Sequence, residues 1–314
     1  MLVYVAKRLA QLVVIVFVIS VLAFLLVHLL PGDPTLTILG PNDTPQARAQ
    51  LLQQLGLNKS LLQQYWTWLT NVLHGNLGES FITHQTVTNA VATAIPIDIE
   101  LIILSQLMAL VVAIPLALFA ALRPNGKLDR VANSGSFAML SIPTFVAAVI
   151  LVLVFAVELH WVPATGFNRL SQGLGPNLKS AVLPSVALAL GSVVIYFRLL
   201  RTDLIATLQE DFVTMARSKG LSTRYILLRH ALRPSSFSLL AGAGISIGSL
   251  LTGTFVVEYL MQLDGLGFQL VNAINQRDYL MVQGFALVIA VFYVLINFVV
   301  DFVLTLLDPR VRRA

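Results

Sequence analysis

The sequence predicts an all-α, polytopic membrane protein with six transmembrane helices and an external helical insert. The first reason is composition: 57% of the 314 residues are hydrophobic and 11% are charged, whereas about a quarter of the residues in a soluble domain are charged. The second is a set of six stretches without any charged side chain, since crossing a bilayer takes about 20 apolar residues. The third is a more polar segment of 68 residues between the first two stretches.

These stretches divide the chain into three parts. Residues 1–32 hold the N-terminus and the first span, residues 33–100 form the external insert, and residues 101–314 form a core with the other five spans. The first stretch is too long for a signal-peptide core, so it is expected to remain as a span. The spans are predicted at Leu9–Gly32, Leu101–Leu122, Val131–Val157, Ser180–Phe197, Pro234–Val257 and Tyr279–Val300.

The positive charges predict the orientation. Fifteen of the 20 lysines and arginines lie in the N-terminus, the tail and the loops at residues 123–130 and 198–233. Cytoplasmic loops carry the excess of Lys and Arg, so we expect a multi-pass protein of the cell (inner or plasma) membrane with both termini cytoplasmic. The chain then contacts membrane lipid, and its basic pI of about 9.7 requires no nucleic-acid partner.

The external insert is predicted to be helical. Thr44 followed by Pro45 is typical of a helix start, and Gly56 is a stop signal after an apolar-periodic run. Ser60 with Gln63 three residues later fits a capping box that opens a second helix.

Aromatic and proline residues each have two interpretations. The second insert helix carries Tyr65, Trp66 and Trp68, which favours an interfacial belt or, alternatively, a surface that receives a substrate-delivery protein. Pro115 and Pro143 lie inside the second and third spans. They predict kinked helices, either lining a path or serving packing alone.

Two later spans carry informative side chains. The fifth span is rich in small residues, and Gly244 with Gly248 has the spacing that lets helix backbones approach closely. We therefore place this span at a subunit or pore interface. Asn297 and Asp301 share a face of the sixth span; an acid there relays protons or has a structural role, and its position near the cytoplasmic end favours the structural one.

A polar, basic stretch at Asp211–Pro234 separates the fourth and fifth spans. Asp211 is predicted to cap a short helix at Phe212–Lys219, and Gly220 to stop that helix in the left-handed conformation. Ser222 would cap a second helix that runs to about residue 232 and ends before Pro234. The result is a bent element along the cytoplasmic membrane face, with side chains pointing outward.

Within this stretch Ala216–Ser222 reads A-R-S-K-G-L-S and Arg229–Arg233 reads R-H-A-L-R. The stretch resembles the EAA loop of ABC importer permeases, in the form found in the dipeptide/oligopeptide/nickel branch. Thr214-Met215-Ala216 stands where the general pattern has Glu-Ala-Ala, and Leu263-Asp264 replaces a usual Trp-Pro pair. Other segments similar to that family are Tyr4–Leu9, His28–Pro34, Leu55–Tyr65, His74–Ser80, Glu158–Phe167 and the ending from Asp301 to Arg310.

The resemblance implies the fold of a type I ABC importer permease. It also implies that the cytoplasmic loop at residues 198–233 contains a coupling helix that docks into a cleft of an ATPase subunit. The ATPase-coupling residues carried over to this chain are Asp211, Phe212, Thr214, Met215, Ala216, Arg217, Lys219, Gly220, Leu221, Ser222 and Arg224.

The implied function is that of a permease subunit of an ATP-driven importer for di- or oligopeptides, working by alternating access. Its implied partners are a second homologous permease subunit, two ATPase subunits and an extracytoplasmic substrate-binding protein. Uptake of glutathione or of nickel chelates remains an alternative, because the same scaffold serves those substrates in this family.

Motif searches support a permease rather than an enzyme. No G-x-x-x-x-G-K-[ST] sequence occurs, so we expect no cofactor in this chain and ATP with Mg²⁺ in the partner ATPases. The five histidines are scattered and cysteine is absent, so no metal site or catalytic group is predicted. An ion-coupled secondary transporter is the other class left open, and the residues that line the substrate path are not identified.

Overall fold

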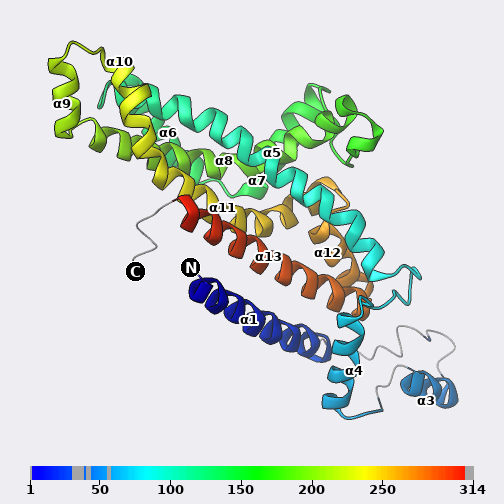
Figure 1. The fold of residues 1–314 in the computed structure, drawn as a ribbon. Helices are drawn as coiled ribbons and strands as arrows, with labels where there is room; N and C mark the ends of the chain where they lie inside the picture. The colour runs from blue at the N-terminus through cyan, green and yellow to red at the C-terminus, as the bar shows by residue number, and fades with distance from the viewer. Residues whose placement is uncertain (1, 30–38, 40–43, 55–57, 308–314) are drawn as a thin grey trace. The chain divides into compact units, whose positions relative to one another are not determined.

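The computed structural model describes residues 2–29, 39, 44–54 and 58–307, and in this part of the chain every regular element is a helix (Figure 1). Only an isolated bridge between Glu79 and Thr86 pairs extended backbone there. The helices are α1 (Leu2–Leu29), α3 (Pro45–Gln54), α4 (Leu61–Leu73), α5 (Val87–Leu122), α6 (Lys127–Leu140), α7 (Thr144–Leu151), η2 (Val152–Glu158), η3 (Leu170–Gln172), α8 (Leu174–Thr207), α9 (Asp211–Ser218), α10 (Thr223–Ile226), η4 (Leu227–Ala231), α11 (Leu232–Met261), α12 (Leu266–Gln276) and α13 (Tyr279–Leu307).

Four of the predicted spans are long, apolar helices. They occupy Val87–Leu122, Leu174–Thr207, Thr223–Met261 and Tyr279–Thr305. Helix α1 covers most of the first predicted span and includes the apolar helix Ala10–Leu25; Gly32 lies outside the described residues. These helices are longer than the uncharged stretches. Residues at the two ends of a span contact water, so they can be polar and still belong to the helix. Thus α5 begins at Val87, inside the segment assigned to the insert.

The third predicted span is not a single helix. Helix α6 ends at Leu140, α7 begins at Thr144, and the two segments meet at an angle of 101°. Pro143 occupies the N-cap position of α7, so the predicted kink at Pro143 is confirmed and is a full break. Pro115 behaves differently, since α5 continues through it without interruption.

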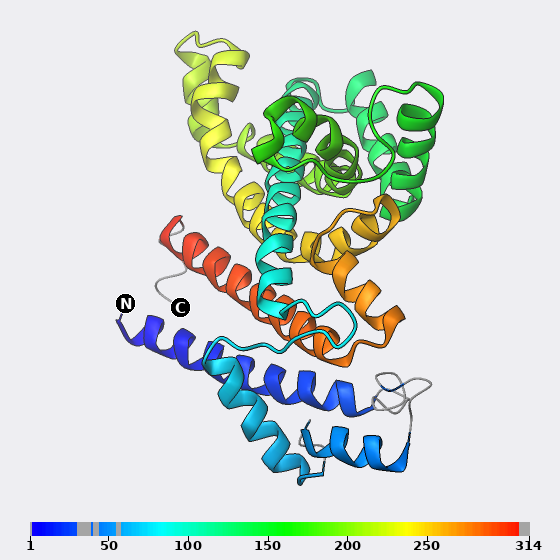
Figure 2. The same ribbon diagram turned by 90° about the vertical axis from the view of Figure 1, so that its right-hand side faces the viewer.

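The chain divides into two compact units, Met1–Pro96 with Asp264–Phe298, and Ile97–Leu263 with Val299–Ala314. In the first unit α1 contacts α4 (Figure 2). The Tyr65 hydroxyl lies 2.8 Å from Ser20 Oγ, and its ring meets the ring of Phe24 edge-on at 5.4 Å. Tyr65 is therefore buried core, which neither interpretation of the aromatic trio anticipates. Trp66 remains exposed.

Local signals in the insert work as predicted. Thr44 Oγ1 accepts a hydrogen bond from the Ala47 amide at 3.2 Å, directly before Pro45 opens α3. Ser60 Oγ accepts from the Gln63 amide at 3.4 Å and caps α4, which is the serine half of the predicted capping box. The expected helix stop at Gly56 lies outside the described residues.

A second cluster in this unit joins the start of α5 to α12 and α13. Val87, Ala90 and Ala94 of α5 are fully or almost fully buried with Leu266 and Phe285. Gly284 allows the closest approach, because a Cβ at this position would lie 2.4 Å from Val87 Cγ1 and 3.2 Å from Val87 Cβ. Valine is stiff at χ1, so the side chain cannot rotate away.

We expect Gly284→Ala to lower the stability of the protein by about 1–3 kcal/mol, the usual cost of overpacking a filled contact. The matched control is Gly253→Ala, whose new Cβ would meet only Leu188 Cδ2 at 3.5 Å. That variant should be neutral or slightly stabilising, because Ala is the better helix former. Thermal unfolding of the detergent-solubilised variants measures both. Equal melting temperatures would contradict the tight contact.

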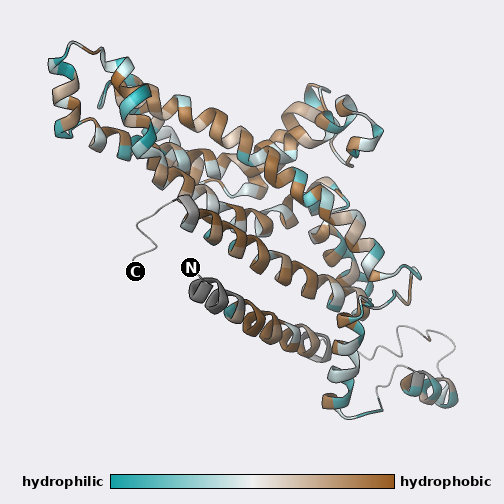
Figure 3. Ribbon diagram, in the orientation of Figure 1, coloured by the Kyte–Doolittle hydropathy of each residue, from teal (hydrophilic) through white to brown (hydrophobic). Residues whose placement is uncertain are grey.

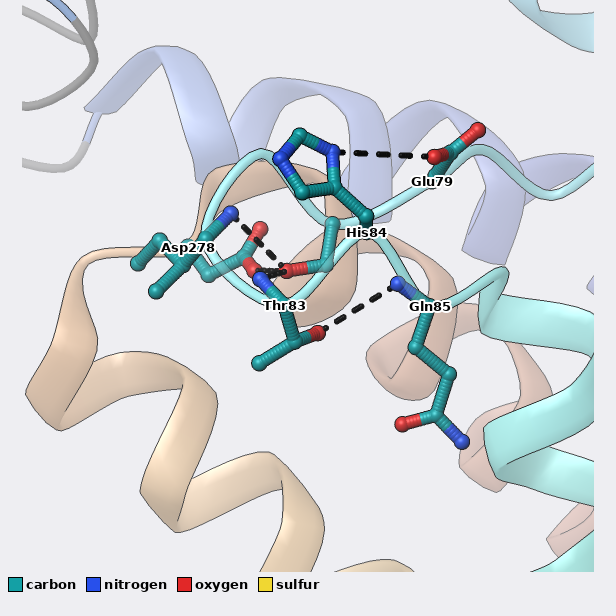
Figure 4. Close-up of polar contacts among 7 residues, drawn as sticks. Glu79, Thr83, His84, Gln85 and Asp278 are labelled. Atoms are coloured by element: carbon teal, nitrogen blue, oxygen red, sulfur yellow. Dashed lines mark hydrogen bonds and ion pairs between the residues drawn. The ribbon is translucent and has the colours of Figure 1, made fainter.

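A polar network ties the end of the insert to the start of α13 (Figure 4). Ser80 Oγ donates to Asp278 Oδ2 and accepts from the amides of Ile82 and Thr83 at 3.1 and 2.9 Å. Asp278 Oδ1 accepts from the Met281 amide at 3.3 Å, so Asp278 caps α13 as well. Both side chains are buried. Figure 4 also shows His84 facing Glu79 across the exposed rim of this turn.

Replacing Asp278 by Ala removes a helix cap and leaves the Ser80 hydroxyl without its acceptor. We expect a loss of about 1–3 kcal/mol in unfolding free energy. Asp264→Ala is the control, since Asp264 is exposed and its removal should change stability by less than about 0.5 kcal/mol. Unfolding monitored by circular dichroism distinguishes the two, and a silent Asp278→Ala would show that the network is not needed.

Helix α8 is the centre of the second unit. Buried residues make up 72% of its most apolar stretch, and α6, α7 and α11 all contact it. Its largest buried side chains are Tyr196 and Phe197. They share a core with five alanines of α5, which are Ala109, Ala113, Ala117, Ala120 and Ala121.

The small residues of the fifth span allow close packing inside the chain. A Cβ at Gly242 would lie 2.5 Å from Leu199 Cδ1 of α8, and one at Gly244 would lie 2.5 Å from Val300 Cγ1 of α13. The predicted close approach is therefore confirmed. Gly244 serves a contact between helices of the same chain, and the placement of this span at a subunit or pore interface stays a prediction.

Candidate functional site

The predicted cytoplasmic element consists of α9 and α10, which contact each other at one end of the second unit (Figure 1). Helix α9 begins one residue earlier than predicted. Glu210, in an extended conformation, is the N-cap residue, and its side chain makes no capping hydrogen bond; its carbonyl accepts from the Val213 amide at 3.0 Å. The predicted cap at Asp211 is thus wrong. Asp211 lies in the first turn and Arg217 in the last, where both charges still oppose the helix dipole.

Gly220 ends α9 as predicted. Its φ is +81°, and the amides of Gly220 and Leu221 donate to Arg217 O at 2.9 Å and Ala216 O at 3.3 Å. No atom lies within 4 Å of a Cβ built at this position. Glycine is therefore favoured by the left-handed backbone conformation and not by lack of space.

The second helix starts as predicted but does not end at Pro234. Ser222 Oγ accepts from the Tyr225 amide at 3.4 Å and caps α10. From there the chain stays helical through the π-helical segment η4 into α11, so that Thr223–Met261 forms one helical path of 39 residues. The π-helical segment just before Pro234 accounts for the difference, because local π geometry helps to satisfy the backbone carbonyl that proline, lacking an N–H, leaves without a donor.

Buried side chains hold the base of this element. Val213 of α9 and Ile226 of α10 are completely buried. Leu227 and Ala231 of η4 join the same core as Leu200 and Leu204 of α8. The hydroxyls of Thr207 and Ser235 lie 2.9 Å apart and connect the two chain segments that enter and leave the element.

The outer surface of the element combines large apolar side chains with cations. Phe212, Met215, Tyr225 and Leu228 are 44–59% exposed, and in Figure 3 the α9–α10 end of the chain mixes hydrophilic and hydrophobic residues while α5 is mostly hydrophobic. Of the predicted coupling residues, Ala216 and Leu221 are half-buried. The others are exposed, namely Asp211, Phe212, Thr214, Met215, Arg217, Lys219, Gly220, Ser222 and Arg224. Exposed apolar groups rimmed by charge are typical of a protein-binding surface.

An ion pair that sequence reasoning missed lies near this element. Arg201 of α8 makes two hydrogen bonds to Asp129 of α6, from Nε to Oδ1 and from Nη2 to Oδ2, the second at 2.7 Å. The Asn125 amide donates to the same Oδ2 at 2.8 Å. Asp129 is almost completely buried. The sequence offered only one signal, an acid among the basic residues of loop 123–130, and we had counted those residues for topology alone.

Arg201→Met should lower the free energy of unfolding by about 3 kcal/mol, because it leaves the Asp129 carboxylate buried without its cation. The double variant Asp129→Asn with Arg201→Met should recover part of that loss. Arg198→Met is the control: its guanidinium lies 4.6 Å from the Phe137 ring centre at an exposed site, so the cost should stay near 0.5 kcal/mol. Chemical unfolding in detergent measures the series, and equal losses for Arg201→Met and Arg198→Met would contradict this.

Asn297 and Asp301 make hydrogen bonds inside their own helix, α13. Asn297 Nδ2 donates to Tyr293 O at 2.9 Å, and the Asp301 carbonyl accepts from Thr305 Oγ1 at 2.7 Å. Both contacts lie within α13, so the structural role of Asp301 stays a prediction. The basic residues of the tail lie outside the described residues.

Comparison with known proteins gives a consistent result along the chain. Residues 113–313 match the family described as binding-protein-dependent transport system inner membrane component, and residues 1–102 match the N-terminal part of that membrane component. The chain is 34% identical over 310 residues to a probable peptide ABC transporter permease protein of Sinorhizobium fredii, covering 99% of each chain. It is 34% identical over 312 residues to the glutathione transport system permease protein GsiC of Escherichia coli, with the same coverage.

A putative peptide transport system permease protein of Brucella abortus is 35% identical over 306 residues, covering 98% of each chain. These matches include both the helical insert and the α9–α10 element. The chain belongs to the family of binding-protein-dependent transport system inner membrane components.

Proposed function

We propose that this chain is the permease subunit of an ATP-driven importer of di- or oligopeptides, coupled to separate ATPase subunits through residues 211–234. The observation that carries the proposal is the division of the α9–α10 element into a buried inner side and an exposed outer side. Val213 and Ile226 hold its inner side in the protein, while Phe212 and Met215 of its outer side stay exposed beside Arg217 and Lys219. Such a surface is suited to dock into a cleft with an acidic rim.

The partners follow from the kind of transport system. A binding-protein-dependent system needs a soluble protein that delivers the substrate, and this chain carries no phosphate-binding loop, so ATP and Mg²⁺ belong to ATPase subunits. We propose two such ATPases and a second, homologous permease subunit, with both termini of this chain in the cytoplasm. The chain itself then has no catalytic residue; its contribution is to change conformation when the ATPases move α9 and α10.

Two relatives are named for peptide transport and one for glutathione transport. Glutathione is itself a small peptide, so it is the second candidate substrate. Competition by glutathione against uptake of a labelled dipeptide would separate the two, because the true substrate should compete at the lower concentration.

We expect Gly220→Val to separate ATP hydrolysis from uptake. A β-branched residue at φ +81° costs about 1–2 kcal/mol in backbone strain, and relief of that strain should reorient α10 relative to α9. The core under the element remains, so the variant should insert and assemble. The measurement compares ATP hydrolysis with peptide uptake in membrane vesicles that contain the whole importer.

Gly220→Asn is the matched control, because Asn tolerates the left-handed conformation. It should retain most of the uptake that Gly220→Val loses. Normal uptake by Gly220→Val would contradict the coupling role. Uptake that stops when the proton gradient is removed, but continues without ATP, would instead indicate an ion-coupled transporter.

A further inference from the structure

The break between α6 and α7 lies inside the third predicted span, away from both of its ends. Within the uncharged stretch Val131–Val157, ten residues precede the break at residues 141–143 and fourteen follow it. Ten helical residues are about 15 Å long, and the 101° bend tilts at least one of the two segments away from the membrane normal, so the break lies inside the roughly 30 Å of a hydrocarbon core. The 101° bend is therefore placed where a span has no headgroups or bulk water around it.

A bend of this size fits either a crossing span or a re-entrant loop, and the positive charges decide between them. The loop before the break, residues 123–130, contains three lysines and arginines, and the loop at 198–233 contains seven. A re-entrant loop would put these two basic segments on opposite faces of the membrane, against the rule for cytoplasmic loops. The broken pair therefore crosses.

The break exposes backbone amides, and lipid tails cannot form hydrogen bonds with them. Residues 141–145 are all exposed on the chain. Pro143 offers no side-chain hydrogen bond to the first turn of α7, where the amides of Thr144 and Phe145 precede the first intrahelical bonds. Each unsatisfied amide would cost several kcal/mol in lipid, so irregular backbone at this depth faces either water or protein.

The exposed side of α6 carries hydroxyls between apolar side chains, of which Val131 and Phe137 are 72% and 53% exposed. Asp129 and Ser136 mark the buried side of the helix. The opposite side carries Ser134, Ala138 and Ser141, spaced by four and three residues and all exposed. Ser141 Oγ donates back to Phe137 O at 3.1 Å, which leaves the hydroxyl oxygen free to accept from a solute.

We propose that the α6–α7 break lines the aqueous translocation path of this permease. Ser134 and Ser141, with the free amides at the start of α7, offer hydrogen bonds to the main chain of a peptide in transit. That the solute is a peptide rests on the proposed function. That the break faces water rests on the family and on the geometry of the break. Packing of the break against the second permease subunit is the competing arrangement.

The natural absence of cysteine makes a direct test possible. Ser141→Cys and Ser134→Cys are introduced singly into the complete importer, reconstituted in lipid vesicles, and each is treated with a charged, water-soluble thiosulfonate. Val111→Cys is the control, since Val111 lies midway along the second predicted span and is 70% exposed. Co-purification of the other importer subunits with each variant before labelling shows that it is assembled.

The thiolate is the reacting form, and a thiol in lipid does not ionise, so Ser141→Cys should react at least about tenfold faster than Val111→Cys. A saturating dipeptide should slow that reaction. Reaction of Ser141→Cys only with a lipid-soluble maleimide, or with neither reagent because a partner helix covers it, would overturn the proposal. Fast reaction without protection by dipeptide would support the water-lined break and count against the dipeptide as substrate.

Discussion

Close contact between helices through small side chains is the interaction on which the second unit depends. Lipid tails are as apolar as leucine, so helices in a membrane gain little from the hydrophobic effect and associate by tight packing. The alanines of α5 and Gly242 of α11 provide that packing against α8. Because α8 leads into α9 and α11 follows α10, the same contact positions the α9–α10 element.

That element combines a rigid base with a surface that is available to a partner. Val213 and Ile226 are buried completely, while Met215 and Leu228 are more than half exposed. Under the proposed coupling to an ATPase, a loop without the buried residues would absorb the push by deforming. An element without the exposed ones would offer the ATPase little to hold. The left-handed turn at Gly220 joins the two short helices in a bent shape that one continuous helix could not adopt.

Features decided by neighbouring residues could be predicted from the sequence. Ser222, Ser60 and Thr44 cap helices because a hydroxyl three residues before a free amide needs no distant partner. The prediction of Asp211 as the N-cap failed although Asp is a preferred cap residue, because the helix begins after Glu210, whose side chain makes no capping hydrogen bond. The prediction that the second helix ends before Pro234 failed, because the expectation that proline ends a helix takes no account of the π-helical segment before it. The Ser80–Asp278 bond joins residues 198 positions apart, and no periodicity encodes it; Asp129 with Arg201 is a second case.

The unbroken helical path from Thr223 to Met261 acts as a lever through the membrane. Its 39 residues correspond to about 58 Å at 1.5 Å per residue. Rotation of roughly five degrees about its midpoint would displace each end by about 2.5 Å, in opposite directions. A small displacement at the α10 end is therefore sufficient to move the far end by a distance comparable to the length of a hydrogen bond. One rod of this length can thus open one side of a permease while it closes the other.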